Sequence, residues 1–271
     1  MSAPPRPFPQ VIAHRGASDQ LAEHTLRAYT KALTDGADAL ECDVRLTADG
    51  HLICVHDRRI DRTSNGRGVV STLRLDELER WDFETWKQPW ADLDDERDDA
   101  DVPPGAVLTL ERLCGLIADC DRPVELAIET KHPTRYAALV ERRLVELLDR
   151  FGWSRPGPAE RPRARVMSFA WTSLRRVREL APRVPTVFLM DRVSRRFRNG
   201  SLPLGGDIAG PSIDIVRAHP SYVGRAHRAG HSVHVWTVND PVDLRLCHDL
   251  GVDAVITDRP AESVLLFQQW S

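Results

Sequence analysis

The sequence predicts an α/β protein whose strands close into a (β/α)8 barrel. From about residue 107 onward, short apolar segments alternate with longer amphipathic segments, and this alternation is typical of a parallel sheet covered by helices. An open doubly wound sheet is the alternative, but no glycine-rich dinucleotide fingerprint follows any apolar segment. Eight candidate strands, the number that closes a barrel, begin at Val11, Leu40, Val124, Ala164, Thr186, Ile208, Ser232 and Ala254.

Length and composition favour one barrel domain over residues 1–271. The chain has 271 residues, 42% of them hydrophobic, and barrels typically use about 250 residues as one domain. A net charge of -3 gives no electrostatic reason to expect binding to nucleic acid or to a membrane surface. We expect a small-molecule substrate instead, and the oligomeric state is left open.

Cysteine usage and apolar runs indicate a cytoplasmic protein. The five cysteines are scattered without a Cys-x-x-Cys pair, which is typical of free thiols in a reducing compartment. Residues 1–9 are proline-rich and lack the apolar core of a secretory signal. No run approaches the roughly 18 apolar residues of a membrane span, so no integral membrane segment is expected.

The first strand, from Val11, ends at His14 and Arg15 before a glycine turn, and a helix is expected over residues 25–35.

Two further apolar strands, 40–44 and 52–57, are joined by the turn sequence of residues 47–50. That link is too short for a parallel crossover, so the two strands should form an antiparallel hairpin. With the turn centred near Ala48 and Asp49, Glu41 would face His56.

Residues 58–106 differ from the regular alternation and are interpreted as a segment inserted near the C-terminal mouth of the barrel. They contain a polar loop at 62–68, a short helix at 75–81 and an acidic run at 92–101. We expect the acidic run to be a solvated loop. Trp81, Trp86 and Trp90 are expected to pack the insertion onto the barrel.

The rest of the chain supplies the remaining strands and helices. A basic loop at 192–198 is expected to be solvated. The helices are expected at 110–118, 135–151, 172–181, 221–229, 241–250 and from 261, and the strands at 124–131, 164–169, 186–190, 208–213, 232–238 and 254–258.

Polar side chains gather at the C-terminal ends of these strands, where barrel enzymes have their active sites. Residues two apart share a strand face, so Glu41 can point the same way as Asp43, and Glu129 the same way as Lys131. Buried carboxylates need a cationic partner, and oxygen ligands suit Mg²⁺ or Ca²⁺, with Mn²⁺ as an alternative. Zinc is less suited, because it prefers closely spaced His and Cys ligands.

The neighbouring basic residues complete a recognisable chemistry. Arg15 and Lys131 suit a phosphate group. His14 and His56 suit proton transfer from a nucleophile and to a leaving oxygen. Together with the carboxylates they indicate metal-assisted cleavage of a phosphodiester.

An ordered set of short motifs then identifies a family. From Val11 to Pro260 the chain resembles the glycerophosphodiester phosphodiesterase family, a family of TIM barrels with an inserted segment. Its members hydrolyse glycerophosphodiesters to glycerol 3-phosphate and an alcohol with a divalent metal. The motifs are His14-Arg-Gly16, Glu23-His-Thr25, Glu41-Cys-Asp-Val44, His56-Asp57, Arg62-Thr63, Leu108-Thr-Leu-Glu111, Glu129-Thr-Lys131, Ser168-Phe169, Trp236-Thr-Val-Asn239 and Thr257-Asp258.

The resemblance implies a role for each matching position. His14 and His56 would be the acid/base pair. The metal ligands would be Glu41, Asp43 and Glu129; the phosphate would be held by Arg15 and Lys131, and the pocket walled by Phe169 and Trp236. Similarity to phosphoinositide-cleaving enzymes further implies that the glycerol hydroxyl attacks first, through a cyclic phosphate.

One position departs from the family pattern. The family usually has Glu-Asn-Thr where this chain has Glu23-His24-Thr25. An asparagine offers a fixed amide donor and acceptor, whereas a histidine can be charged or neutral. The departure therefore bears on the polarity of the inner pocket, while Glu23 remains a candidate metal ligand or partner of one.

Two alternatives to this hydrolase remain open at this point. A phospholipase D-like or lyase relative acting on lysolipids would release a cyclic phosphate as its final product. A phosphate-ligand binding protein without catalysis would show equal turnover in the wild type and the His14→Ala variant.

Overall fold

A computed structural model describes residues 8–87, 105–158, 160–203 and 206–270 of the chain. Within these residues, eight parallel strands form a closed ring, because β1 (Gln10–His14) pairs with both β2 (Ala39–Leu46) and β9 (Ala254–Thr257). The predicted barrel is confirmed. The ring continues through β4 (Glu125–Thr130), β5 (Ala164–Ser168), β6 (Thr186–Met190), β7 (Ile208–Pro211) and β8 (Ser232–Val235).

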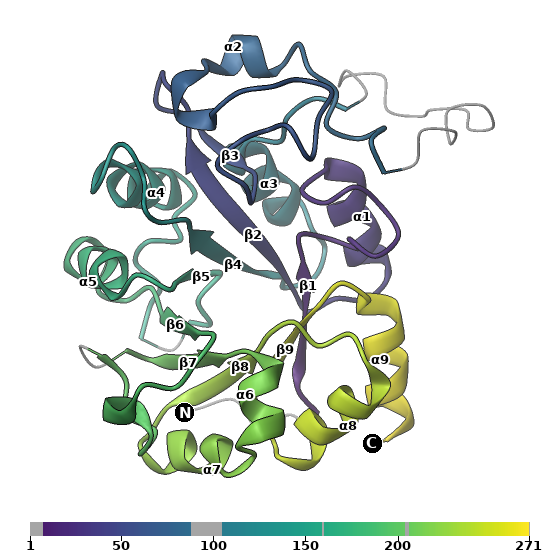
Figure 1. Ribbon diagram of the computed structural model, residues 1–271, viewed down its shortest axis with the longest axis vertical. Helices are drawn as coiled ribbons and strands as arrows, with labels where there is room; N and C mark the ends of the chain where they lie inside the picture. Colours follow the sequence, from purple (N-terminus) through teal and green to yellow (C-terminus); the bar gives the residue numbers. More distant parts are fainter. Residues whose placement is uncertain (1–7, 88–104, 159, 204–205, 271) are drawn as a thin grey trace.

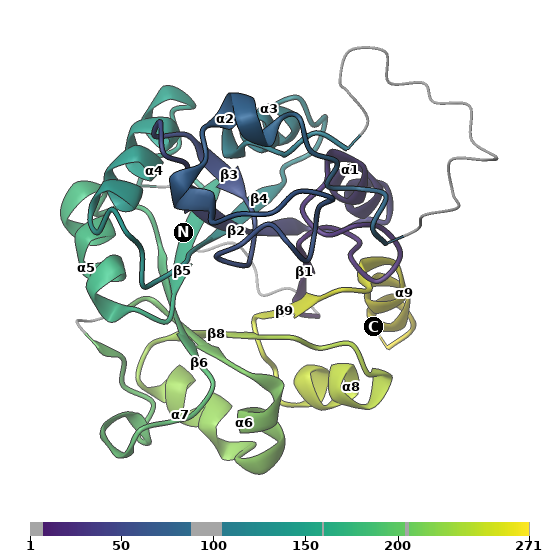
Figure 2. The same cartoon turned by 45° about the horizontal axis from the view of Figure 1, so that its top comes forward.

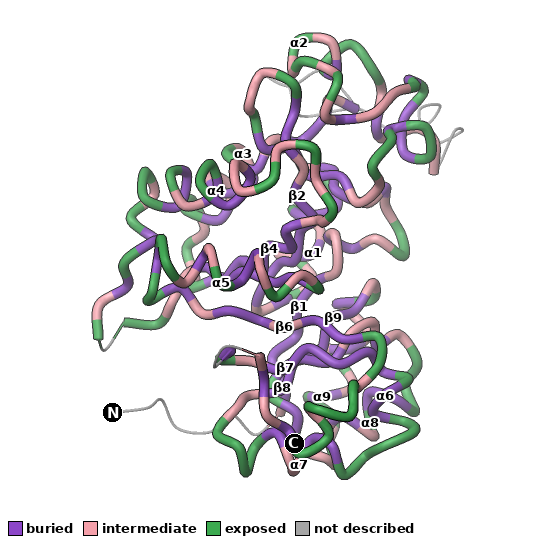
Figure 3. The backbone as a smooth tube through the Cα atoms, turned by 60° about the vertical axis from the view of Figure 1, so that its left-hand side comes forward, coloured by how far each residue is buried: buried purple, intermediate pink, exposed green. Residues whose placement is uncertain are grey.

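Helices surround the ring on the outside (Figures 1 and 2). Their apolar faces and the outward faces of the strands form the main hydrophobic core, in which Tyr29, Leu40 and Leu126 are fully buried. Figure 3 shows the buried residues concentrated along the strands and the inner faces of the helices. The helices are α1 (Leu26–Thr34), α3 (Leu110–Ala118), α4 (Leu139–Arg150), α5 (Trp171–Leu180), α6 (Ile213–Ala218), α7 (Ser221–Arg228), α8 (Pro241–Asp249) and α9 (Pro260–Gln269).

The interior of the barrel is stacked in layers, because alternate residues of each strand point inward. The first layer is polar, with Arg165 donating to Gln10 over 2.8 Å and pairing with Glu125. The middle layer is apolar and includes Ile12, Ala39, Ala127, Met167, Val187, Leu189, Ala254 and Ile256. Two residues further along several of these strands stand His14, Glu41, Glu129, Phe169 and Asp258. The period-two pattern therefore delivers the polar residues to the C-terminal mouth.

The antiparallel hairpin of β2 with β3 (Leu52–Cys54) is confirmed, but its predicted register is wrong by one residue. Val44 pairs with Cys54, so Glu41 does not face His56. The turn is closed by the Thr47 amide donating to His51 O over 2.9 Å, and it is therefore centred on Asp49. This register keeps Cys54 beside Val44 in the outer core, whereas a one-residue slip would reverse the faces.

Several elements differ from the sequence prediction: α2 (Leu75–Leu78) and β8 each end three residues before the predicted end, and the largest differences concern α4 and α6. The helix expected over 135–151 begins at Leu139, because Ala137 adopts a left-handed φ of 44° that interrupts it. The strand expected over 208–213 ends at Pro211, and α6, which was not predicted, follows it. Burial of Ile213, Ile215 and Val216 outweighs the preference of β-branched residues for strands.

The described part of the insertion packs through a small apolar cluster that includes Ile60, Val70 and Leu78. It contains a short 3-10 turn, η1 (Val70–Thr72), and α2 (Leu75–Leu78), above β3 in Figure 1. A second 3-10 turn, η3 (Arg195–Phe197), lies in the exposed basic loop after β6.

The predicted acidic run at 92–101 and Trp90 lie outside the described residues, and the single-domain assignment stays a prediction. None of the described helices combines the length and apolarity that crossing a membrane requires.

Arg62 joins the insertion to the loop before α1. Its guanidinium donates to both carboxylate oxygens of Glu23 over 2.7 Å and to Asp57 over 2.6 Å. Burial opposes ionisation of both acids. Even so, the pKa of each carboxyl falls to about 2, because contacts that stabilise the ionised form outweigh burial. The hydrogen bond from Arg62 is the largest of these contacts.

These lowered pKa values predict that an Arg62→Ala variant loses stability against unfolding, and that the loss depends on pH. A carboxyl whose pKa is lowered in the folded state stabilises the protein above its unfolded pKa of about 4, and this stabilisation is lost as the pH falls toward about 2. The variant should therefore have a lower urea midpoint than the wild type at pH 7, with the difference shrinking between pH 5 and pH 2.5. Arg59→Ala, which removes an exposed pair with Asp61, is the control. An equal difference at both ends of the range would show that Arg62 acts through packing.

The conformation and close packing of Gly16 predict that a side chain at this position destabilises the fold. It has a φ of 90°, and a Cβ at this position would lie 2.7 Å from the main-chain carbon of Ala28 in α1. A Gly16→Ala variant should lose stability both from backbone strain of about 1–3 kcal/mol and from displacement of α1. Gly230→Ala has the same kind of φ but no atom within 4 Å, so it isolates the strain. Urea unfolding of both variants measures the difference, and equal losses would contradict the predicted clash.

Candidate active site

A pocket of about 150 Å³ opens at the C-terminal ends of the strands. Its walls come from strands that are far apart in the sequence, which closure of the barrel brings together. It collects eight of the nine residues singled out from the sequence: His14, Arg15, Glu41, His56, Glu129, Lys131, Phe169 and Trp236. The ninth, Asp43, is fully buried behind the wall.

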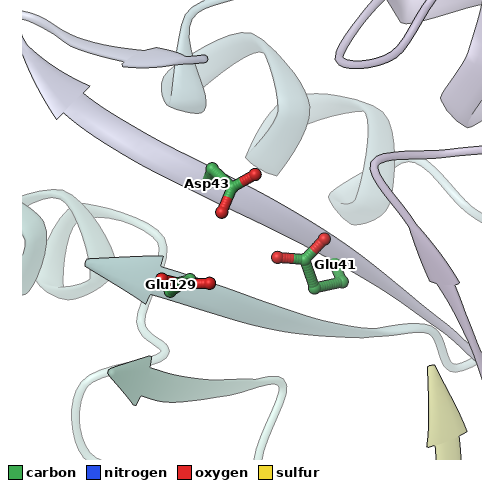
Figure 4. A group of neighbouring side chains, drawn as sticks. All are labelled: Glu41, Asp43 and Glu129. Atoms are coloured by element: carbon green, nitrogen blue, oxygen red, sulfur yellow. The ribbon is translucent and has the colours of Figure 1, made fainter. Parts of the chain in front are cut away.

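Three carboxylates from β2 and β4 converge at this mouth. Glu41 and Asp43 point from β2 toward Glu129 on the neighbouring strand β4, as Figure 4 shows. Asp43 and Glu129 are paired across the two strands, so their positions are fixed by the register of the sheet. One oxygen atom of each acid lies within 4.8 Å of the other two, and the residues are 2%, 0% and 8% exposed.

Two cations lie against the carboxylates. Lys131 Nζ is 2.9 Å from Asp43 Oδ1 and 2.8 Å from Glu129 Oε1. Arg15 Nε is 2.9 Å from Asp43 Oδ2, and the Arg15 amide donates to Glu41 Oε2 over 3.1 Å. Arg15 has a left-handed φ of 57°, a conformation that non-glycine residues rarely adopt. The left-handed conformation therefore occurs at the residue whose amide donates to the Glu41 carboxylate.

The acids do not ionise equally. Burial, and next the charge of Asp43, raise the pKa of Glu41 well above its usual value and that of Glu129 to about 7. Burial also opposes the charge on Asp43, but the hydrogen bond from His24 and the charges of Lys131 and Arg15 hold its pKa well below the usual range.

The acidic cluster fits a divalent cation. Asp43 Oδ1 is buried, and among the described residues its partner is Lys131 Nζ, 2.9 Å away in an ion pair. A hard cation with oxygen ligands would relieve the repulsion that raises the pKa values of Glu41 and Glu129. Zinc is not favoured, since no cysteine joins the cluster: Cys42 points into the outer core.

Each histidine of the pocket is held by a carboxylate through Nδ1. His14 Nδ1 lies 2.6 Å from Asp258 Oδ1, and His56 Nδ1 lies 2.7 Å from Asp57 Oδ1. Ser18 donates to Asp258 over 2.8 Å and helps to fix it. Because a carboxylate only accepts hydrogen bonds, both rings carry a proton on Nδ1 and leave Nε2 for a ligand. Burial lowers the pKa of His56.

The supporting carboxylates had no assigned role in the sequence analysis. Asp258 is two residues beyond the inward-facing Ile256, so the strand period places it at the mouth. Closure of β9 against β1 follows from the predicted barrel, but the direct contact between the Asp258 and His14 side chains was not predicted.

Two further histidines, His24 and His132, contact buried carboxylates. His24 is buried and contacts Asp43, and burial lowers its pKa. His132 is partly buried, with Nε2 3.0 Å from the buried Glu141.

Aromatic residues line the other side of the pocket. The rings of Phe169 and Trp236 meet edge to face, with their centroids 5.3 Å apart. The Trp236 indole donates to Gly210 O over 2.7 Å, which fixes its orientation, whereas Phe169 is 43% exposed. The pocket therefore has a charged half and an apolar half.

The chain is similar to curated proteins over most of its length. It is 43% identical over 255 residues to the probable glycerophosphodiester phosphodiesterase 1 of Mycobacterium tuberculosis, covering 94% of this chain and 91% of that one. It is 30% identical over 261 residues to the glycerophosphodiester phosphodiesterase of Caldanaerobacter subterraneus subsp. tengcongensis, covering 96% and 98%.

Solved structures share the fold. A putative glycerophosphoryl diester phosphodiesterase from Silicibacter pomeroyi has a TM-score of 0.79 at 25% identity, over 97% of this chain and 94% of that one. A phosphodiesterase from Oleispira antarctica, in complex with the product sn-glycerol-3-phosphate, has a TM-score of 0.78 at 24% identity, over 96% and 97%.

The family profile agrees with the fold, the pocket and these relatives. It matches residues 14–262, which extend from the first histidine of the pocket to the first turn of α9. The chain belongs to the glycerophosphoryl diester phosphodiesterase family.

Proposed function

We propose that this glycerophosphodiester phosphodiesterase requires a divalent cation and uses His14 and His56 as its acid/base pair. The reaction releases glycerol 3-phosphate and an alcohol. The observation that supports the proposal most is the cluster of Glu41, Asp43 and Glu129, whose oxygens lie within 4.8 Å of one another beside both histidines.

The metal would be held by those three carboxylates. A bound dication supplies Lewis acidity and positive charge beside the phosphoryl group. Mg²⁺ and Ca²⁺ suit an all-oxygen site best, with Mn²⁺ as an alternative.

The remaining pocket residues bind and orient the diester. Arg15 and Lys131 would hold the phosphoryl oxygens, since both extend cationic groups to the wall of the pocket. Phe169 and Trp236 would pack against the apolar carbons of the substrate. This division matches the charged and apolar halves of the pocket.

Proton transfer requires the two free Nε2 atoms. In the first step, one imidazole accepts the proton of the attacking glycerol hydroxyl, and the other donates a proton to the leaving alcohol oxygen as the P–O bond breaks, which leaves a cyclic phosphate. A water molecule then opens the ring with the two imidazoles in reversed roles and gives glycerol 3-phosphate. One ring must therefore be neutral and the other protonated, which predicts a bell-shaped dependence of kcat/KM on pH. Asp258 and Asp57 act as positioning residues for the rings.

Metal removal tests the proposal directly. The purified enzyme should release glycerol 3-phosphate from glycerophosphocholine or a related diester. A chelator should abolish this release, and Mg²⁺, Mn²⁺ or Ca²⁺ should restore it. Full turnover in the chelated enzyme would contradict the metal requirement, and a cyclic phosphate as the final product would favour a lyase.

Substitution of the pocket histidines tests the acid/base assignment. His14→Ala and His56→Ala should each lower kcat by about 10²–10⁴-fold, the usual contribution of a positioned acid or base. His227→Ala, at a half-exposed histidine paired with Asp253, is the control. Wild-type turnover in either pocket variant would remove that histidine from the mechanism.

The Asp258→Asn variant tests orientation separately. An amide can donate to Nδ1 and so stabilise the wrong tautomer of His14. We expect kcat to fall at least about tenfold while KM changes little, by analogy with the tautomer effect in other acid–His pairs. The variant should unfold at a lower urea concentration than the wild type, because Asp258 also accepts from Ser18. The kinetics are therefore measured in the absence of urea, where both proteins are folded. A change in KM alone would contradict a positioning role.

A further inference from the structure

His24 is a buried side chain that contacts the acidic cluster without lining the pocket. It is 6% exposed, and its Nε2 lies 3.0 Å from Asp43 Oδ2. Its Nδ1 lies 2.8 Å from the hydroxyl of Tyr29, a fully buried residue of α1. The same hydroxyl lies 2.9 Å from Glu41 O, and its single hydrogen is donated either to that oxygen or to Nδ1 of the ring. One imidazole and one phenol therefore connect the side chain of Asp43 to the main chain of Glu41.

The ring is fixed from its own backbone as well. His24 has a left-handed φ of 62°, and its amide donates to Arg15 O over 3.1 Å. The next residue, Thr25, caps α1 by accepting from the Ala28 amide. The backbone thus aims the ring at Asp43, while Tyr29 holds the opposite edge of the ring.

One contact of the Asp43 carboxylate comes from a residue that does not line the pocket. Among the described residues, its carboxylate has contacts with Arg15, Lys131 and His24. Arg15 and Lys131 line the pocket, where the proposed function also requires them to hold the phosphate. His24 lies outside the pocket lining, so its contact with Asp43 can persist in every step.

We propose that His24, anchored by Tyr29, is a positioning residue that fixes the side chain of Asp43 and so sets the affinity of the acidic cluster for a divalent cation. The inference rests on the metal site of the proposed function and extends it to two residues outside the ligand set. A ligating carboxylate held in one rotamer loses less conformational freedom when a cation binds.

Asparagine at position 24 is an informative replacement. It tolerates a left-handed φ, so the substitution adds little backbone strain. Its side chain is shorter than an imidazole and cannot reach Asp43 and the Tyr29 hydroxyl together. The His24→Asn variant therefore removes the bridge while keeping a polar side chain and the backbone conformation.

Direct measurement of Mn²⁺ binding tests the inference. Free Mn²⁺ is measured by electron paramagnetic resonance in a titration of the metal-free enzyme with MnCl2 and no substrate. The His24→Asn variant should raise the Mn²⁺ Kd about tenfold, the lower end of the effect of outer-shell partners on metal affinity. Tyr29→Phe should raise it by a smaller factor. The double variant should resemble His24→Asn alone, because Tyr29 acts through the ring.

Matched controls separate this role from a loss of folding. Tyr222→Phe removes another buried phenol hydroxyl, and His227→Asn removes another His–Asp contact; neither should change the Kd. Wild-type binding of Mn²⁺ with variant Kd values within twofold, whatever the change in Tm, would overturn the inference and leave the metal site standing. Failure of the wild type to bind Mn²⁺ would instead overturn the metal site and the inference with it.

Discussion

The burial of three carboxylates at one end of the barrel is the constraint on which the rest of the site depends. A buried anion is costly unless it is paired or hydrogen-bonded, and here Glu41, Asp43 and Glu129 are buried side by side. Much of the neighbouring structure can be understood as a response to this cost. Arg15 and Lys131 supply positive charge, and His24 supplies a hydrogen bond to the most buried acid.

Barrel geometry explains why the cluster forms at all. Strands β1 and β4 each place a polar residue at the first inward position, an apolar one in the middle and a polar one at the mouth: Gln10, Ile12 and His14 in β1, and Glu125, Ala127 and Glu129 in β4. The apolar middle layer separates the charges of the mouth from the Arg165–Glu125 pair at the opposite end. The residues of the pocket therefore lie at the C-terminal ends of the strands, and the Arg165–Glu125 pair lies at their N-terminal ends, where conserved barrel residues usually contribute to stability.

The sequence predicted the strands, the hairpin and the charged pocket residues because each depends on a local pattern, whereas Phe169 and Trp236 were assigned to the pocket by the family resemblance. Period-two alternation placed Glu41 and Asp43 on one face, and the turn residues identified the hairpin. The hairpin register was missed because it depends on one additional turn residue, His51, closed by a main-chain hydrogen bond. Helix α6 was missed because its β-branched residues favour a strand until packing is considered.

Contacts between distant segments could not be predicted in the same way. Asp258 meets His14 only because the last strand closes on the first, and His24 meets Tyr29 and Asp43 only once α1 packs on β2. The cytoplasmic location also stays a prediction, because the fold does not test it.

The position of a bound cation tests the central claim most directly. Crystals of the enzyme soaked in Mn²⁺ should give an anomalous difference peak among Glu41, Asp43 and Glu129, with carboxylate oxygens about 2.0–2.6 Å away, the range of oxygen-ligated divalent ions. A saturating soak that places Mn²⁺ elsewhere, or that leaves this cluster without a peak while the crystals turn over substrate, would contradict the account.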